Sequence, residues 1–450
     1  MARDETTAGG VTRALAGRIV ALRGDAVPEE ARIWARHCLT DWIAVTVAGR
    51  DEPIVRALRG LAAEGPLPLL ASGRHAALRD AVLVNGAAGH ALDYDDVNAE
   101  MRGHPTVPLA PVVLALGAVQ GTPGRAVLEA FVAGYEAACL IGAMTGDGHY
   151  DAGFHATGTV GTFGAAAAAG HLLQLAPEAM ERAFGLAAAQ AAGLKSMFGT
   201  DAKPFHAGKA AVNGLLAAQL AAGGATAAAG SLEAPQGFFA TQCPGAEAVL
   251  PGPRAEGRLA VTQTLFKYHA ACYLTHSVIE AAARLRTEDG VRPEDIARLE
   301  LHVADTLRSV CDLAAPETGL EVKFSVRHLA AMGLTGRDTA ALDAYTADIA
   351  RDPELVTLRE RIELHPRPGG FDAAARVVAR LVDGTVREVA HDVAIPTTDL
   401  DAREARLLAK ARLLMAPVIG EERTEAALDQ LSHLDGAASI EGLMEGLAAR

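Results

Sequence analysis

Apolar side chains recur at helical spacing along the first half of the chain. In residues 32–48, RIWARHCLTDWIAVTVA, they return every three or four positions, which places them on one face of a helix. Comparable patterns follow at residues 76–92, 108–119, 125–145, 161–175, 177–193 and 209–222. Short segments containing Gly or Pro separate them, as expected where helices end and begin. These patterns predict a helical domain over residues 1–264.

The pattern changes after about residue 265. Residues 297–307, ARLELHVADTL, alternate apolar and polar side chains, which is typical of a β-strand. Residues 375–396 contain two alternating stretches on either side of Asp383-Gly384, and an Asp-Gly pair favours a tight hairpin turn. Helical periodicity precedes these stretches at residues 278–288 and returns from residue 402 onward. The second part of the chain is therefore predicted to contain both strands and helices.

Length and composition bear on the fold class. At 450 residues the chain is longer than one ordinary core accommodates, so two or three domains are expected. Half of the residues are hydrophobic and only 4% are aromatic, and a mixture rich in Ala, Leu and Val favours closely packed helices. We predict a mainly α protein with a large all-helical domain, a smaller α+β domain over residues 265–400, and C-terminal helices over residues 401–450 that return to the helical domain.

Charge and cysteine content weigh against several classes of partner. The net charge is −14 without a Lys/Arg-rich block, which argues against binding of nucleic acid and against docking on an anionic membrane. The five cysteines are dispersed and include no C-x-x-C pair, so neither a disulfide framework nor a zinc site is indicated. The N-terminal residues lack a secretory pattern. We expect a cytoplasmic protein that binds a small anionic substrate in a local basic pocket.

The longest uncharged run, residues 156–177, approaches the length of a membrane-spanning helix. It consists largely of Ala, Gly and Thr, which transfer poorly into lipid but suit close contacts between helices. The run is therefore predicted to be a buried helix of a soluble protein.

One segment between two helical patterns is unusually rich in ionisable side chains. Residues 89–106, GHALDYDDVNAEMRGHPT, hold three aspartates, a glutamate, an arginine and two histidines. A solvated loop between helices would account for this composition. The alternative is an acid/base site, because carboxylates and imidazoles at this density can hold and transfer protons. The candidates are Asp93, Asp95, Asp96, Arg102 and His104.

A second candidate segment leads into a predicted helix. In residues 153–164, GFHATGTVGTFG, His155 precedes Thr157 and Thr159. The glycines would let a ligand approach the backbone, and the first amides of a helix attract an anion. A helix cap with small-residue packing is the alternative. The segment does not fit a dinucleotide-binding loop, because no strand precedes it.

A third segment concentrates positive charge in an otherwise acidic protein. Residues 195–214 include Lys195, Lys203, His206 and Lys209. Pro204 and Gly208 are expected to break the chain so that a helix begins at Lys209, which would display several donors at a turn. An ordinary basic loop is the alternative interpretation.

A fourth segment, LFKYHAACYLTHS at residues 265–277, contains Lys267, His269, Cys272 and His276. The last three side chains are possible metal ligands. The signal for a metal is weak, because no second ligand pair repeats their spacing.

Five segments, in this order, closely resemble the MmgE/PrpD family: HALDYDDVN…GHP, GFHATGTVGTFGAAAAA, DAKPFHAGKAAVNG, KYHAACYLTH and VKFSVRHLAAMGL. The resemblance spans most of the chain. It implies a large helical domain completed by the C-terminal helices, a smaller α+β domain, a homodimer and no organic cofactor. It also implies dehydration, epimerisation or decarboxylation of a small di- or tricarboxylate.

The resemblance also assigns roles to individual positions. Around a pocket between the two domains it places a catalytic set of Asp93, His104, His155, Lys203, Lys267 and His276. The same segments are expected to contact the substrate through Asn98, Arg102, Thr157, His206, Lys209 and His269. No metal ligand is expected. Two departures bear on the substrate, since Val97 stands where the family commonly has Thr and KYHAACYLTH differs from the motif of the methylcitrate branch.

The chemistry implied by the resemblance takes place at a carbon next to a carboxylate. Removing a proton or carbon dioxide there builds negative charge on oxygen, which the ammonium groups of Lys203 and Lys267 are suited to stabilise. His104 and His155 are the expected base and acid, because imidazole both accepts and returns a proton near neutral pH. Asp93 would orient one of them or act as the base itself.

The primary hypothesis is therefore a cofactor-independent, dehydratase-like lyase. An epimerase or a decarboxylase of a similar substrate stays open, because the same residue types can build either site. The stretch DDVNAE at residues 95–100 also resembles the Mg²⁺-binding motif of terpenoid synthases, but the chain is poor in aromatic residues and lacks an evident second motif. A non-enzymatic helical binding protein is the remaining alternative.

Overall fold

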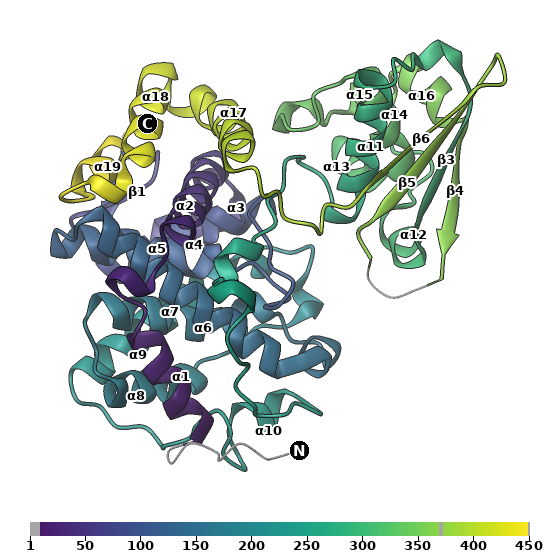
Figure 1. Cartoon of the computed structure of the whole chain (residues 1–450). Helices are drawn as coiled ribbons and strands as arrows, with labels where there is room; N and C mark the ends of the chain where they lie inside the picture. Colours follow the sequence, from purple (N-terminus) through teal and green to yellow (C-terminus); the bar gives the residue numbers. More distant parts are fainter. Residues whose placement is uncertain (1–9, 369–371, 449–450) are drawn as a thin grey trace. The chain divides into compact units, whose positions relative to one another are not determined.

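The computed structural model describes residues 10–368 and 372–448 (Figure 1). It is 60% helical with 10% strand, which confirms the mainly α fold. The chain divides into two compact units. The first comprises the residues up to Phe266 together with those from Leu407 onward, and the second comprises Lys267–Arg406. The C-terminal helices thus return to the helical unit.

The first unit consists of helices and one small hairpin. Its helices are α1 (Gly10–Val20), α2 (Glu29–Gly49), α3 (Pro53–Leu61), α4 (Leu78–Ala91), α5 (Thr106–Gln120), α6 (Gly124–Asp151), α7 (Ala156–Leu172), α8 (Pro177–Ala188), α9 (Ala202–Ala222), α10 (Phe238–Gln242), α18 (Glu421–Ser432), α19 (Glu441–Gly446) and most of α17 (Leu400–Ile419). The hairpin pairs β1 (Leu67–Leu69) with β2 (Arg74–Ala76).

Helix α7 forms the centre of this unit. All of its residues from Ala156 to His171 are buried, which confirms the buried helix predicted for this run. Small residues allow the neighbouring helices to come close, because a Cβ added to Gly134 of α6 would lie 2.8 Å from Cβ of Ala168. The helix begins at Ala156, earlier than the periodic pattern starting at residue 161 had indicated. The helical turn that precedes the pattern belongs to the candidate site described below.

Helix α6 is long and apolar enough by composition to cross a membrane, and it is the one such helix in the described parts of the chain. Its most apolar window is 94% buried among the other helices. That burial accounts for its composition as a core helix, because a helix that is apolar on all sides must be covered on all sides.

Helix α9 corrects one sequence-based prediction. The helix begins at Ala202 rather than at Lys209, and both Pro204 and Gly208 lie inside it. Pro204 is tolerated because it falls in the first turn, where its missing N–H has no helical acceptor. Gly208 is needed for packing, since a Cβ there would lie 2.5 Å from the carbonyl oxygen of Leu83. Lys203, His206 and Lys209 are therefore fixed on a helix instead of displayed on a turn.

The second unit contains a four-stranded sheet in the order β4-β3-β5-β6. Its strands are β3 (Ile296–Ala304), β4 (Ile362–Arg367), β5 (Ala375–Leu381) and β6 (Val386–His391). Strands β3 and β4 are parallel, and the other pairs are antiparallel. The helices are α11 (His276–Thr287), α12 (Asp305–Cys311), α13 (Gly319–Val322), α14 (Val326–Thr335), α15 (Ala347–Ala350) and α16 (Pro353–Arg359).

The antiparallel pair β5 and β6 confirms the hairpin predicted at Asp383-Gly384. The strand predicted over residues 297–307 ends earlier, at Ala304, because Asp305 begins α12. Alternation in β3 places Leu299 and Leu301 in the core. Residues 305–307 continue the alternation of apolar and polar side chains, although they form the first turn of a helix.

Candidate active site

The loop between α4 and α5 carries the acidic cluster seen in the sequence. His90 lies in the last turn of α4, and Asp93 follows directly after the helix ends. Asp93 has a φ of 50°, a left-handed conformation that Asp adopts more readily than most residues with a side chain. Its side chain is 52% exposed, whereas Asp95 is buried. The turn thus presents one carboxylate outward and holds the other inside the unit.

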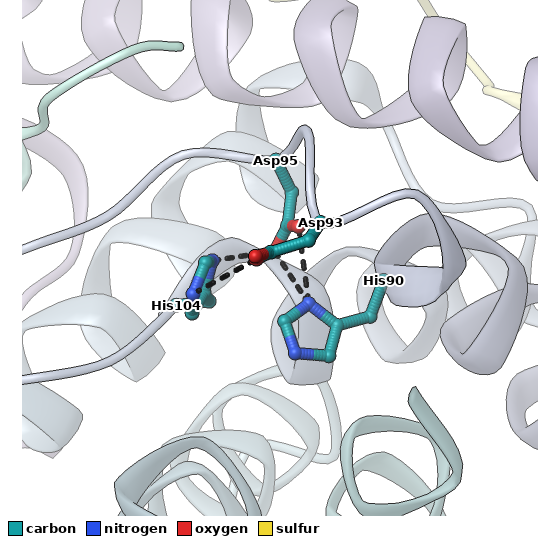
Figure 2. Close-up of side chains that lie close together, drawn as sticks. All are labelled: His90, Asp93, Asp95 and His104. Carbon is teal, nitrogen blue, oxygen red and sulfur yellow. Dashed lines mark hydrogen bonds and ion pairs between the residues drawn. The ribbon is translucent and has the colours of Figure 1, made fainter. Parts of the chain in front are cut away.

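Asp95 lies between two imidazoles (Figure 2). One carboxylate oxygen is 3.0 Å from Nδ1 of His90, and the other is 2.9 Å from Nδ1 of His104. Burial by itself would raise the pKa of the Asp95 carboxyl, but His104 and His90 together hold that pKa well below its usual value. Asp95 is therefore a carboxylate that orients both rings.

The two imidazoles differ in their surroundings. Burial lowers the pKa of His90 to about 4 despite the adjacent Asp95, so His90 is neutral and donates its Nδ1–H to that carboxylate. His104 has a second carboxylate nearby, because its Nε2 is 3.6 Å from Oδ1 of Asp93. His104 is thus placed between two carboxylates.

Lys203 supplies the positive charge of the cluster. From the first turn of α9, its ammonium lies 2.9 Å from Oδ1 of Asp93, the same oxygen that faces His104. The Lys203 side chain is 16% exposed and its ammonium lies 5.5 Å from the centroid of the Phe198 ring. A substrate carboxylate at this point would meet an ammonium group whose present partner, Asp93, is half exposed.

His155 is the third histidine of the cluster. It is the N-cap residue of α7, and its ring lies 5.8 Å from that of His90. Burial lowers the pKa of His155 strongly, and the neighbouring His90 and Lys203 lower it further. His155 is therefore neutral at physiological pH.

His206 is the hydrogen-bond partner of His155. The two Nδ1 atoms are 3.2 Å apart, so one of them carries a hydrogen and the other accepts it. His206 lies one helical turn after Lys203 on the same face of α9. Its observed role is to fix the ring of His155, and its predicted contact with substrate stays a prediction.

Two of the residues predicted to contact the substrate are occupied by the loop itself. The hydroxyl of Thr157 accepts a hydrogen bond from the backbone N–H of His104 at 3.1 Å. The side-chain oxygen of Asn98 accepts from the backbone N–H groups of Glu100 and Met101. In the structure Thr157 and Asn98 thus shape the loop, and their predicted contacts with substrate stay predictions.

Arg102 and Lys209 are the other two residues of the first unit predicted to contact the substrate. Arg102, at a φ of 54°, forms an ion pair with Asp147 of α6. That partner accounts for the charge of Arg102 without a substrate. Lys209 lies further along α9 and is partly buried. Its role stays a prediction.

Lys267, His269 and His276 belong to the second unit. His269 uses both ring nitrogens, with Nδ1 2.7 Å from the hydroxyl of Thr339 and Nε2 3.0 Å from Glu280. Both nitrogens thus have partners within the unit, and the predicted contact of His269 with substrate stays a prediction. His276 donates from Nε2 to the carbonyl of Ala271 at 3.2 Å, and burial holds its pKa well below the usual value.

Sequence reasoning missed His90 as a member of the site. The residue lies inside the stretch GHALDYDD but falls in the helical pattern of residues 76–92, where a buried histidine is usually a core residue. Its spacing from Asp95 was the available signal. A helix that ends directly after His90 can turn back and bring an aspartate onto the same ring.

Asp96 differs from its neighbour Asp95 in charge. It is buried, and Thr106 donates a hydrogen bond to it within the unit. Burial raises the pKa of the Asp96 carboxyl to about 8, and the charges of Asp41 and Asp95 contribute in the same direction. Two consecutive aspartates thus have opposite protonation states at neutral pH, because only Asp95 is matched by imidazoles.

Replacing Asp96 with Asn should make the protein less sensitive to alkaline pH. Because the folded-state pKa lies above the ordinary value of 3.8, the stability contributed by the neutral carboxyl is complete below that value and is lost as the pH rises to about 8. Relative to wild type, the variant should gain up to about 5 kcal/mol of unfolding free energy across this range. Denaturant unfolding at several pH values measures the difference.

The exposed residue Asp289 provides the control, since Asp289→Asn should track wild type at every pH. Equal stability of wild type and Asp96→Asn from pH 4 to pH 9 would show that Asp96 is ionised in the folded protein.

The four side chains in Figure 2 are also a possible set of metal ligands. Their ligand atoms lie within 4.8 Å of one another, and two imidazoles with two carboxylates suit zinc or iron. Two contacts favour an acid/base network instead. Asp95 is already within hydrogen-bonding distance of both Nδ1 atoms, and the ammonium of Lys203 balances the charge of Asp93.

We expect catalytic activity to survive exhaustive dialysis against EDTA, because the positive charge at this cluster comes from a lysine. The measurement compares kcat/KM before and after dialysis, with protein dialysed against plain buffer as the control. Loss of activity on chelation, restored by a divalent ion, would instead make Asp93 and Asp95 metal ligands.

Comparison with known proteins places this cluster in a family. The MmgE/PrpD N-terminal domain matches residues 13–250, and the MmgE/PrpD C-terminal domain matches residues 269–434. The chain belongs to the MmgE/PrpD family. This membership confirms the resemblance carried by the five segments, and the gap between the two matches contains the boundary between the structural units at Phe266.

The proteins to which the chain is similar include several decarboxylases. A cis-aconitate decarboxylase of Aspergillus terreus (strain NIH 2624 / FGSC A1156) is 27% identical, with 98% of this chain and 96% of the relative aligned. The cis-aconitate decarboxylase of Homo sapiens is 30% identical over 64% of this chain and 61% of its own length. That of Mus musculus is 29% identical over 68% and 65%.

Proposed function

We propose that this protein is a cofactor-independent lyase that removes carbon dioxide from a small tricarboxylate of the cis-aconitate class. The observation that carries the proposal is the cluster of Lys203, His104 and His155 around the carboxylates of Asp93 and Asp95. Its support outside the structure is the name shared by relatives that align with nearly the whole chain. Family membership weighs against a terpenoid-type enzyme and against a non-enzymatic binding protein.

The reaction creates negative charge that the protein must stabilise. When the bond to the departing carboxylate breaks, its electron pair stays on the substrate and spreads onto a neighbouring carboxylate. An ammonium at that carboxylate is worth more in the transition state than in the ground state, because the charge it faces increases there. Lys203 is proposed for this role in the first unit. Lys267 is proposed as a second cation on the strength of the family resemblance alone.

The electron pair is then captured by a proton. His104 is the proposed donor, because it is the imidazole of the cluster in contact with both carboxylates, with Asp95 and Asp93 2.9 Å and 3.6 Å from its two ring nitrogens. Asp95 also fixes the direction of the ring. The sum of the two steps exchanges carbon dioxide for a proton and needs no oxidant or reductant.

Dehydration of a hydroxy-tricarboxylate is the second candidate function. It requires a base to remove a proton as well as an acid to release the hydroxyl group. The observation in its favour is neutral His155, whose lowered pKa leaves it unprotonated beside His104. Decarboxylation makes no use of such a base, so the presence of both groups keeps this candidate open. Epimerisation is a third, weaker possibility.

We also infer, from the family resemblance, that the protein acts as a homodimer in the cytoplasm. The described cysteines are all free thiols, as expected in a reducing compartment. Size-exclusion chromatography with light scattering tests the oligomeric state.

The test of the proposed function is a panel of substrates followed by NMR. Cis-aconitate, citrate, methylcitrate and hydroxy-dicarboxylates are each incubated with purified protein, and carbon dioxide release is measured in parallel. Consumption of cis-aconitate with one equivalent of carbon dioxide supports decarboxylation. Interconversion of citrate-type and aconitate-type compounds without carbon dioxide would replace it with dehydration. No turnover of any of these compounds would contradict both candidates.

A further inference from the structure

A buried ion pair next to the loop between α4 and α5 has no part in the proposed chemistry. Lys410, on α17, is 3% exposed, and Asp41, on α2, is 2% exposed. The ammonium of Lys410 is 2.7 Å from Oδ1 of Asp41. Burying two charges is costly, and an apolar pair of similar volume often serves stability as well or better. The pair therefore calls for an explanation other than stability.

The second contact of Lys410 reaches the loop itself. Its ammonium donates a hydrogen bond to the backbone carbonyl of Tyr94 at 2.9 Å and lies 3.8 Å from the centroid of the Tyr94 ring. Tyr94 is 1% exposed. The hydrogen bond and the cation–π contact together fix both the main chain and the side chain of this residue.

Tyr94 stands between the two aspartates of the candidate site. On one side is Asp93, whose φ of 50° is a conformation that surrounding contacts must maintain. On the other side is Asp95, whose backbone nitrogen shares a peptide plane with the Tyr94 carbonyl. Rotation of this peptide would turn the Asp95 carboxylate away from His90 and His104. Holding this carbonyl therefore holds the peptide that directs the Asp95 carboxylate.

We propose that Lys410 is a positioning residue for the acid/base loop, with Asp41 as the counter-ion that allows the ammonium to be buried. The C-terminal helix α17 thereby completes the site from a distant part of the sequence. The proposal deepens the proposed function and rests on it for its kinetic consequence. Its structural consequence, the orientation of the imidazoles of His90 and His104, can be measured without any substrate.

The test compares Lys410→Met with the double variant Lys410→Met/Asp41→Asn. The single variant leaves a buried carboxylate without its cation and is expected to lose stability. The double variant removes both charges, so its melting temperature should return toward that of wild type while the bond to the Tyr94 carbonyl is still absent. The double variant thus separates positioning from stability. Arg412→Met is the control, because Arg412 is on the same helix as Lys410 and the substitution removes only an exposed ion pair with Glu425 of α18.

Two readouts are expected to change in the folded double variant. The value of kcat on the substrate identified above should fall about tenfold or more with little change in KM, because a small displacement of catalytic groups is costly in rate. In histidine-labelled protein, the NMR signals of His90 and His104, assigned by substitution, should move, since their hydrogen bonds to Asp95 are altered.

The outcomes decide between positioning and structural roles. A double variant with wild-type kcat and unchanged imidazole signals would overturn the proposal. Failure of the double variant to fold would overturn it as well, because the pair would then be a requirement for folding. If no substrate is found for wild type, the proposed function fails, and the imidazole signals alone still support or reject the positioning role.

Discussion

Replacing Lys203 with Ala is expected to lower kcat/KM by about a hundredfold or more, an effect comparable to the loss of one donor from an oxyanion site. The ammonium of Lys203 contacts Asp93 in the cluster. Its loss removes the positive charge that is proposed to stabilise the negative charge developing on the substrate carboxylate. The fold should persist, because the partly exposed lysine contributes little to the core. Steady-state kinetics together with the melting temperature measure both effects.

Lys195 offers a matched control from the same basic segment. Its ammonium donates to the backbone carbonyl of Tyr150 at 3.0 Å and lies 3.6 Å from the centroid of that ring. Lys195→Ala should therefore change stability slightly and leave kcat/KM near wild type. Normal turnover by Lys203→Ala would remove this lysine from the mechanism.

Substitution of the two histidines with Gln should divide proton transfer into separable parts. Gln keeps the approximate shape and hydrogen-bonding capacity of imidazole but cannot titrate. If the reaction is dehydration, with His155 accepting a proton and His104 donating one, His155→Gln should lose exchange of the substrate α-hydrogen with D₂O. His104→Gln should keep that exchange and fail to complete the reaction. His104→Gln is expected to lose about a hundredfold or more in turnover under either candidate function, and His155→Gln should show a comparable loss only if the reaction is dehydration.

The pH dependence of wild type should agree with this division. Because burial strongly lowers the pKa of His155, this residue should add no acid limb to the kcat/KM profile near neutral pH, and the profile should fall at alkaline pH when the protonated group of the free enzyme is lost. His433→Gln, which alters an exposed histidine of the C-terminal helices, is the control and should behave as wild type. Parallel loss of exchange and turnover in both site variants would indicate a structural pair, and wild-type behaviour of both would transfer the acid/base role to other residues.

The sequence was sufficient to predict most of the secondary structure. Apolar periodicity identifies α2, α4, α5 and α6, because each buries one or more faces in the same core. The hairpin at Asp383-Gly384 was predictable from local turn chemistry alone. The start of α9 was not, since Pro204 and Gly208 usually interrupt helices and the reason for Gly208 is the backbone of α4.

The candidate site could be located as segments but not as contacts. Asp93, His104, His155 and Lys203 were predictable because the residue types of their segments suit proton transfer and match a family. The partners of Asn98 and His269 depend on loop closure and on a distant glutamate, which no local pattern encodes. In a segment rich in polar side chains, reactive residues can therefore be distinguished from structural ones only when their hydrogen bonds are known.

The different states of Asp95 and Asp96 show the same limit in electrostatic terms. The two residues are adjacent and chemically identical in sequence. Asp95 is charged because His104 and His90 flank its carboxylate. Asp96 is neutral because it is buried and the hydroxyl of Thr106 is a weaker partner than an imidazole. Protonation depends on groups that folding brings together. The contact between Lys410 and the Tyr94 carbonyl could likewise not be predicted from the sequence, because the two residues are far apart along the chain.

The most direct test of the central claim is the fate of cis-aconitate incubated with the protein in D₂O and followed by ¹H and ¹³C NMR. Transfer of a proton from His104 requires a product that has lost one carboxylate and gained one deuteron on carbon, with a rate that falls about a hundredfold or more in Lys203→Ala. Unchanged cis-aconitate after prolonged incubation, or a decarboxylated product without solvent deuterium, would contradict proton-coupled decarboxylation at this site.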